Sequence, residues 1–149
     1  MMPIRPENKA RYPANWKAIS QQVRDEAGNR CKQCGVENGK MIYRGWHEKR
    51  PAWRYESDTV FECSRCAIDG SELHSTTWDD FEVARGTVKV VLTVAHLDHQ
   101  PENCAPENLR AWCQRCHNAY DAPMRAAGIK DRARMARASG DLLSVLHKP

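Results

Sequence analysis

The first clear hydrophobic pattern follows a polar, proline-containing arm. Its apolar residues recur at spacings of three and four, as they do on one face of a helix: Trp16, Ile19 and Val23. Asn15 stands before the pattern as a candidate N-cap, and Gly28 follows it as a natural stop. The pattern predicts an amphipathic helix over residues 16–27.

The clearest strand pattern is the β-branched, apolar run over residues 88–96. Alternate positions share one face: Val88, Val90, Leu92, Val94 and His96. A polar loop leads to a predicted return strand, Leu109–Trp112, and a helical segment follows. Strand, loop, strand and helix form a ββα unit, which places the chain in the α+β class.

The other segments carry weaker patterns. Residues 36–86 are irregular and predict a loop-rich insertion, with short strands at Met41–Arg44 and Thr59–Glu62. Near the other end, Pro123 predicts the end or a kink of the helix that follows the return strand. A final basic helix is expected over residues 129–146.

Length and hydropathy limit the fold. The chain has 149 residues, which suits one domain with an insertion. Its expected parts are residues 16–35, 36–87, 88–122 and 123–149. Mean hydropathy is −0.75 and no apolar run approaches 18 residues, so we expect no transmembrane helix. The first residues lack an apolar stretch, so we expect no secretory leader and a reducing, cytoplasmic setting.

Charge is unevenly distributed along the chain. Residues 1–50 carry 11 Lys+Arg and 5 Asp+Glu, or +6; residues 51–100 carry 4 and 9, or −5; the remainder carries 8 and 5, or +3. Basic ends around an acidic middle suggest a nucleic-acid-binding face, although solvated surface charge would look the same. The candidate DNA-contacting residues are Lys17, Arg24, Arg125, Lys130, Arg132, Arg134 and Arg137.

Six of the seven cysteines fall in Cys-x-x-Cys pairs: Cys31/Cys34, Cys63/Cys66 and Cys113/Cys116. Two intervening residues let a tight turn present both thiolates to one tetrahedral ion. Three such pairs without a surrounding βαβ pattern favour zinc over redox chemistry. Cys104 is left over and is expected to be a small buried or half-exposed side chain.

The order of these motifs is specific. A Cys-x-x-Cys pair precedes His96-Leu97-Asp98, Pro101, Asn108-Leu109 and the run from Cys113 to His117. In this order the sequence resembles the His-Asn-His (HNH) endonuclease family in its zinc-knuckle form. The resemblance covers residues 16–35 and 88–122.

The resemblance implies a function and three site residues. His96 would act as general base on the water that attacks a DNA phosphodiester. Asn108 would brace the loop and hold His96 in orientation. His117 would bind a catalytic divalent ion, Mg²⁺, Mn²⁺ or Zn²⁺, that neutralises charge on the scissile phosphate.

One position departs from the family pattern. The residue before the general base is usually a metal-binding Asp or His, and here it is Ala95. Asp121, four residues after His117, could share a helix face with it and supply the missing ligand. Asp98 and His99 are further candidates for the catalytic ion.

Ligand type and spacing predict a structural zinc site of four cysteines: Cys31, Cys34, Cys113 and Cys116. A second zinc within the insertion would use Cys63, Cys66, His47 and His74. Other pairings of the knuckles stay open. If Cys31/Cys34 pairs with Cys63/Cys66 instead, His117 becomes a candidate fourth ligand of the remaining site.

Sequence therefore favours a cytoplasmic, metal-dependent DNA endonuclease without a membrane segment, of bacterial or phage origin by analogy. The rival is a non-catalytic zinc module that binds nucleic acid or a protein partner, with the acidic insertion as its contact surface. Ala95 supports this rival. A redox role for Cys63/Cys66 is the third alternative.

Overall fold

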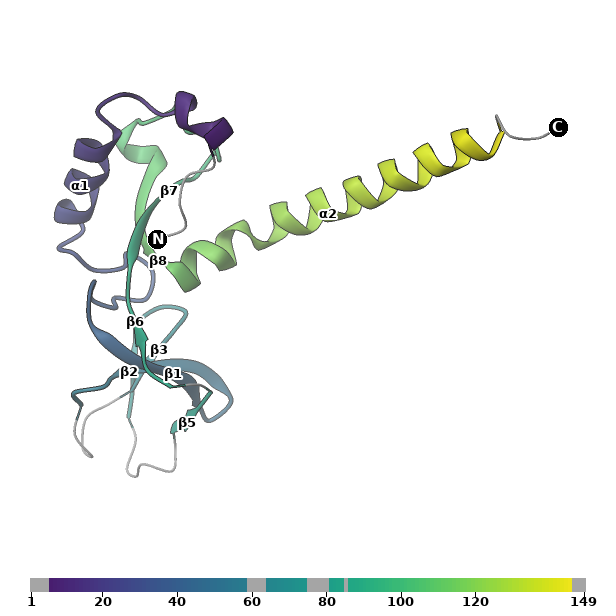
Figure 1. Ribbon diagram of the computed structural model, residues 1–149. Coiled ribbons are helices and arrows are strands. Elements are labelled where there is room, and N and C mark those ends of the chain that lie inside the picture. The colour runs from purple at the N-terminus through teal and green to yellow at the C-terminus, as the bar shows by residue number, and fades with distance from the viewer. Residues whose placement is uncertain (1–5, 59–63, 75–80, 85, 146–149) are drawn as a thin grey trace. The chain divides into compact units, whose positions relative to one another are not determined.

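The structure is a computed structural model that describes residues 6–58, 64–74, 81–84 and 86–145 (Figure 1). It divides into two units, one extending to His117 and one beginning at Asn118. The described helices and strands place the chain in the α+β class, as predicted. None of the described helices is both long enough and apolar enough to cross a membrane.

The first unit begins with the 3₁₀ helix η1, Pro6–Arg11, and the helix α1, Trp16–Glu26. The predicted first helix is therefore confirmed to within one residue. Asn15 occupies the N-cap position, but its side chain makes no capping hydrogen bond. Gly28 takes a left-handed φ of 63° after the last turn, which glycine adopts without steric cost.

A two-stranded antiparallel sheet forms the centre of the ββα unit. Strand β7, Leu92–His96, pairs with β8, Leu109–Cys113, with the 3₁₀ helix η3, Pro106–Asn108, in the loop between them. Helix α1 packs against both strands. The register sets His96 opposite Leu109, at the end of the sheet where the loop leaves.

The strand predicted over residues 88–96 is in fact two strands. Strand β6, Val88–Lys89, pairs with β1 (Met41–His47), whereas β7 pairs with β8. Between them, Val90 donates to Lys40 and accepts from Gly39 at 2.8 Å. These bonds hold the chain where it crosses from one sheet to the other, a long-range constraint that hydrophobic alternation does not reveal.

The predicted loop-rich insertion was wrong in its main feature, because the described residues between 41 and 89 include six strands of one antiparallel sheet. The order is β4-β3-β2-β1-β5, with β6 beside β1. The further strands are β2 (Arg50–Tyr55), β3 (Ser64–Cys66), β4 (Glu72–Leu73) and β5 (Phe81–Val83). The predicted strand at Met41–Arg44 begins β1, and that at Thr59–Glu62 lies outside the described residues.

The β1–β2 hairpin explains why sequence missed this sheet. Its two turn residues, Glu48 and Lys49, both have positive φ, 48° and 66°. Such a turn usually carries Asn-Gly or Asp-Gly, and this chain has neither there. The hairpin therefore lacks its usual local signal.

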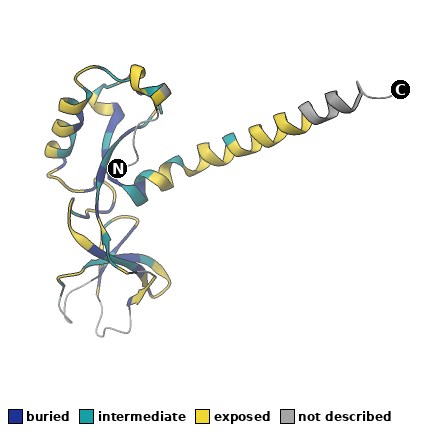
Figure 2. Ribbon diagram, in the orientation of Figure 1, coloured by how far each residue is buried: buried dark blue, intermediate teal, exposed yellow. Residues whose placement is uncertain are grey.

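Alternate residues of the large sheet serve two cores. Ile42 and Trp53 pack in one cluster with four buried cysteines: Cys31, Cys34, Cys113 and Cys116. Tyr43 and Ala52 belong to a second cluster with Phe81 on the opposite face. Figure 2 shows the buried segments of the first unit in dark blue. Full burial of a side chain such as Ile42 contributes about 1.5–3 kcal/mol, so the sheet is a major source of stability.

Helix α2, Gln114–Val145, runs through Pro123 without ending there. The predicted end at this residue and the separate helix starting at 129 were therefore wrong. Pro123 removes one amide donor from the helix. Because Ala119 and Pro123 are both exposed, water can supply that donor to the carbonyl left without its partner.

Candidate metal centre and its surroundings

Four cysteine sulfurs gather in the first unit, from Cys31, Cys34, Cys113 and Cys116. Their Sγ atoms all lie within 4.8 Å of one another, and all four residues are buried. The Cys34 and Cys113 sulfurs are 3.8 Å apart. Tetrahedral zinc with Zn–S bonds of about 2.3 Å places its sulfurs roughly 3.8 Å apart. The predicted grouping is thus confirmed as a cluster that can hold a metal ion.

Local turns position the two Cys-x-x-Cys motifs of this cluster. Cys31–Cys34 is the first knuckle and Cys113–Cys116 is the second. Cys31 accepts a hydrogen bond from Gly35 and donates one to Val36, both at 2.9 Å, which closes the first turn. Lys32 donates to the carbonyl of Ala111 at 2.9 Å and so attaches this turn to β8. The second knuckle starts at the last residue of β8 and ends in the first turn of α2.

The four thiols interact strongly. Hydrogen bonds from Cys116, Cys31 and Cys34 lower the pKa of Cys113, and the bond with Cys113 is the main cause of the raised pKa of Cys116. Four buried thiolates without a cation would repel one another, which favours protonation of part of the cluster. A divalent cation binds in place of such protons.

The large sheet also contacts the metal centre. Arg44 of β1 donates from Nη2 to Cys113 Sγ at 3.7 Å. Gln33, within the first knuckle, donates to the carbonyl of Ile68 at 2.9 Å. Arg115, within the second, donates to the carbonyl of Ala67 at 2.6 Å. The acidic insertion is therefore joined to both knuckles, which sequence reasoning missed because no local motif marks these contacts.

Gly70 completes this contact. It follows the Ala67–Asp69 turn with a left-handed φ of 76°. A Cβ at this position would lie 2.8 Å from the carbonyl oxygen of Cys34. Only glycine allows the turn to approach the first knuckle this closely.

His96 ends β7 and is 8% exposed. Its ring stacks on that of Trp16, with the ring centroids 4.9 Å apart. It makes an edge-to-face contact with the ring of Tyr12 at a centroid distance of 5.8 Å. Its Nε2 lies 3.8 Å from the sulfur of Cys104, which is half-buried as expected. Burial lowers the pKa of His96, although Asp98 and Glu102 oppose this effect. His96 is accordingly neutral near pH 7.

The segment that covers His96 is attached to the loop after β7. Arg11 donates to both carboxylate oxygens of Glu102, at 2.5 and 3.0 Å. This ion pair is solvent-exposed, so it contributes little to stability. It nevertheless holds Tyr12 at the predicted catalytic histidine.

Asn108 lies buried within the same loop. Its side-chain nitrogen donates to Asp98 Oδ1 at 2.9 Å and to the Asn103 carbonyl at 2.8 Å. Its side-chain oxygen accepts from the Asp98 amide at 3.1 Å, and its backbone carbonyl accepts from Leu97 at 2.9 Å. These bonds connect both ends of the loop, which is what a bracing role requires.

His117 is half-buried in the first turn of α2. Its Nδ1 lies 2.8 Å from Thr93 Oγ1, which donates to the Trp112 carbonyl at 3.3 Å. The Thr93 hydroxyl therefore fixes the orientation of the His117 ring through Nδ1 and leaves Nε2 outside this bond. Positive charge on His117 would further lower the pKa of His96, so the two rings lie within electrostatic reach.

The structure does not gather the other residues that sequence suggested as ligands of the catalytic ion. Asp98 accepts bonds on both oxygens, from Gln100 and Asn108 on one and Asn103 on the other. His99 has a left-handed φ of 58°, and Asp121 belongs to the second unit. Ala95 is buried at 1% exposure. Among the described residues, only the four cysteines form a metal-binding group of three or more ligands.

The predicted second zinc set is not gathered in the described part of the chain. Cys63 lies outside the described residues. Of the others, Cys66 and His47 are buried and His74 is exposed. His47 Nδ1 lies 3.2 Å from Ser64 Oγ instead.

The predicted DNA-contacting residues divide between the units. On α1, Lys17 is exposed and Arg24 is half-buried, with a 2.9 Å bond to Gln21. The remaining ones are exposed on α2: Arg125, Lys130, Arg132, Arg134 and Arg137.

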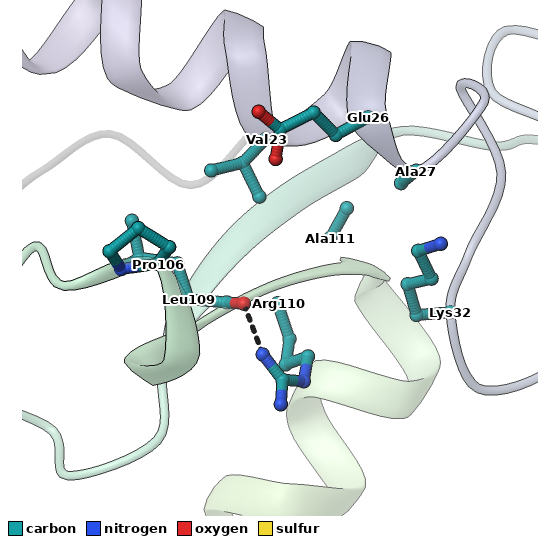
Figure 3. A pocket seen from close by; sticks show the side chains of 8 residues that line it. All are labelled: Val23, Glu26, Ala27, Lys32, Pro106, Leu109, Arg110 and Ala111. Atoms are coloured by element: carbon teal, nitrogen blue, oxygen red, sulfur yellow. Dashed lines mark hydrogen bonds between the residues drawn. The ribbon is translucent and has the colours of Figure 1, made fainter.

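A surface pocket of about 430 Å³ lies beside α1 and β8 (Figure 3). Val23 and Leu109 line it together with the charged residues Glu26, Lys32 and Arg110. Arg110 is already engaged there, because it donates to the carbonyls of Glu107 and Leu109. The pocket contains none of the predicted site residues.

Comparisons with known proteins identify no relative. No family model matches this chain, and searches of curated proteins and of solved structures find no match either.

Proposed function

We propose that this chain is a zinc-braced, metal-dependent endonuclease that hydrolyses phosphodiester bonds of DNA. One observation carries the proposal: His96, Asn108 and His117 occupy the end of β7, the braced loop and the helix start of a single β7–β8–α2 unit. These are the positions that the resemblance to HNH endonucleases requires. The hypothesis draws its chemistry from that resemblance and its geometry from these residues.

The structural metal in this proposal is zinc. Four buried cysteine sulfurs within 4.8 Å of one another, two of them 3.8 Å apart, suit a tetrahedral, closed site. Such a site leaves no position for substrate, so its role is to fasten the first knuckle to β8 and α2. Arg44 would offset part of the negative charge of four thiolates around a dication.

In the catalytic step, neutral His96 takes a proton from the attacking water, and Asn108 holds the loop that follows His96. His117 would offer Nε2 to a divalent ion, because its Nδ1 is engaged with the Thr93 hydroxyl. That ion, when bound, neutralises charge on the phosphate and stabilises the leaving oxygen. Asp98 and His99, both in the loop after β7, are the proposed further ligands of this ion.

A second candidate function has its own support. Trp16 and Tyr12 cover His96, and Ala95 offers no ligand. Both features suit a non-catalytic zinc module that binds nucleic acid or a protein partner. In that case His96 is a core histidine, and the large sheet provides the contact surface.

Plasmid nicking with Mg²⁺ or Mn²⁺ separates the two functions. The nuclease proposal expects metal-dependent nicking that falls about 10²–10⁴-fold in His96→Ala, as for loss of a general base. His74→Ala, at an exposed histidine of the same unit, is the matched control and should retain activity. Zinc content confirms that each variant is folded. DNA binding without metal-dependent nicking would favour the non-catalytic module.

A further inference from the structure

Helix α2 is exposed over much of its length. None of residues 118–138 is buried, and only Asp121 and Gly128 are half-buried (Figure 2). An isolated helix is only marginally stable in water, and helices in proteins usually depend on packing. A partner that covers this helix would therefore stabilise it.

The cations of this helix form two stripes. Residues 118–138 carry five cations and two carboxylates, which gives +3. Lys130, Arg134 and Arg137 are spaced i, i+4 and i+7 and so share one side. Arg125 and Arg132, seven residues apart, lie about 120–180° around the helix from the members of the first stripe, at about 100° per residue. Positive charge thus flanks the helix on opposite sides.

The exposed apolar residues form an interrupted stripe. Tyr120, Met124, Ile129 and Met135 are all exposed. At about 100° per residue, Tyr120 and Met135 lie within roughly 40° of Met124, whereas Ile129 lies about 140° from it. Asp131 stands about 20° from Met124, in the middle of this apolar side. A coiled-coil seam or a membrane-surface helix needs a continuous apolar side, so the carboxylate argues against a partner helix and against a lipid surface.

The cations are available to an external anion. Arg134 forms an ion pair with Asp131 at 3.7 Å, but the two side chains are 80% and 68% exposed, so the pair is weak. Arg125 donates to the carbonyl of Asn118, which leaves its charge uncompensated by that bond. Phosphate oxygens would be stronger acceptors for both guanidinium groups.

We propose that α2 lies in the major groove of duplex DNA, with its two basic stripes on phosphates of opposite strands. A helix with side chains is about 10–12 Å across, and this groove is about 12 Å wide. Phosphates border the groove on both sides, which matches cations on opposite sides of the helix. A-form RNA is a poorer fit because its major groove is deep and narrow. The inference rests on DNA as the partner in the proposed function, but it needs neither cleavage nor the catalytic ion.

Binding of the full chain to a labelled 20-base-pair duplex, measured at several salt concentrations without Mg²⁺ or Mn²⁺, tests this inference. The slope of log K against log salt should be shallower by about 2.7 in the triple variant Lys130→Gln/Arg134→Gln/Arg137→Gln. It should be shallower by about 1.8 in Arg125→Gln/Arg132→Gln. The control is Lys40→Gln/Lys49→Gln/Lys89→Gln, at exposed lysines of the first unit, which should keep the wild-type slope.

Groove choice is tested in the same complex. The chain should protect guanine N7 in the major groove from methylation, and a minor-groove ligand should not displace it. It should also bind the DNA duplex more tightly than the single strand or duplex RNA. Unchanged slopes in both α2 variants, equal binding to single strands, or binding to anionic vesicles but not DNA would overturn the inference. Loss of nicking with these binding results intact would reject only the nuclease proposal.

Discussion

The sulfur atoms of Cys34 and Cys113 lie 3.8 Å apart, although 79 positions of sequence separate the two residues. The intervening chain folds into a sheet that returns to the same centre through Arg44, Ala67 and Gly70. Closing so long a loop costs only slightly more than closing a short one, because the cost grows with the logarithm of length. A metal ion here would fasten the helix α1, the sheet and β8 together.

Metal removal should unfold the first unit. Structural zinc contributes about 10–16 kcal/mol of apparent binding free energy in small zinc domains, which exceeds the stability of most domains of this size. A strong chelator, or the variant Cys113→Ser, should therefore abolish the cooperative thermal transition followed by circular dichroism. Cys104→Ser is the matched control because this thiol is outside the cluster, and it should keep both transition and metal.

Gly70→Ala should destabilise the chain more than Gly39→Ala does. Both glycines have left-handed φ, 76° and 79°, so alanine is strained at either position by about 1 kcal/mol or more. Only at Gly70 would the added Cβ also collide with the carbonyl of Cys34, since Gly39 has open space around it. Urea midpoints measure the difference. Equal losses of stability in the two variants would show that the Cβ at position 70 does not collide with the carbonyl of Cys34.

Asn108→Ala should cost about 1–3 kcal/mol of stability, because the Asp98 amide and the Asn103 carbonyl lose part-buried bonds to the buried Asn108 side chain. Asn103→Ala removes a 2.7 Å bond to Asp98 Oδ2 and a 3.3 Å bond from the Ala105 amide, and it should cost less because both bonds are exposed. Chemical denaturation ranks the two variants. A larger loss for Asn103→Ala would contradict the bracing role of Asn108.

Acidification should weaken the fold through His96. Burial lowers the pKa of His96 below its ordinary value of 6.5, so the unfolded chain binds more protons than the folded one between these two values. Stability is therefore complete above about pH 6.5 and declines as pH falls below it. His96→Gln should flatten this part of the profile of urea midpoint against pH. An identical slope in wild type and variant would contradict the buried, neutral imidazole.

Opening the cover over His96 should increase the reactivity of its ring. Arg11→Ala and Glu102→Ala each break the ion pair that holds Tyr12 near His96, so diethyl pyrocarbonate should modify His96 several-fold faster in either variant. The charge-reversed pair Arg11→Glu/Glu102→Arg should restore protection. Peptide mapping identifies the modified histidine. Rates that do not change in the single variants would show that the ion pair does not control access.

Sequence predicted the parts of this fold that carry local signals. Helix α1 has apolar periodicity and a glycine stop, and the four cysteines have a spacing that only a shared ion explains well. The six-stranded sheet was missed because its hairpin turn uses Glu48 and Lys49 in place of glycine or asparagine. The bonds of Arg44 and Arg115 to the knuckle region were beyond sequence reasoning, because they depend on how distant segments pack.

The predicted catalytic residues show the same division. Asn108 braces its loop through contacts within ten residues, which the motif order already suggested. The burial of His96 beneath Trp16 depends on how α1 packs against β7, and no sequence pattern near His96 predicts it.

X-ray absorption at the zinc edge tests the central claim most directly, that the four cysteines hold one zinc ion. The sample is the Cys66→Ser variant purified without chelator, which lacks a ligand of the second predicted site. We predict one zinc per chain with four sulfur ligands at about 2.3 Å. A chain without bound metal, or zinc with nitrogen or oxygen in place of any of the four sulfurs, would contradict the account.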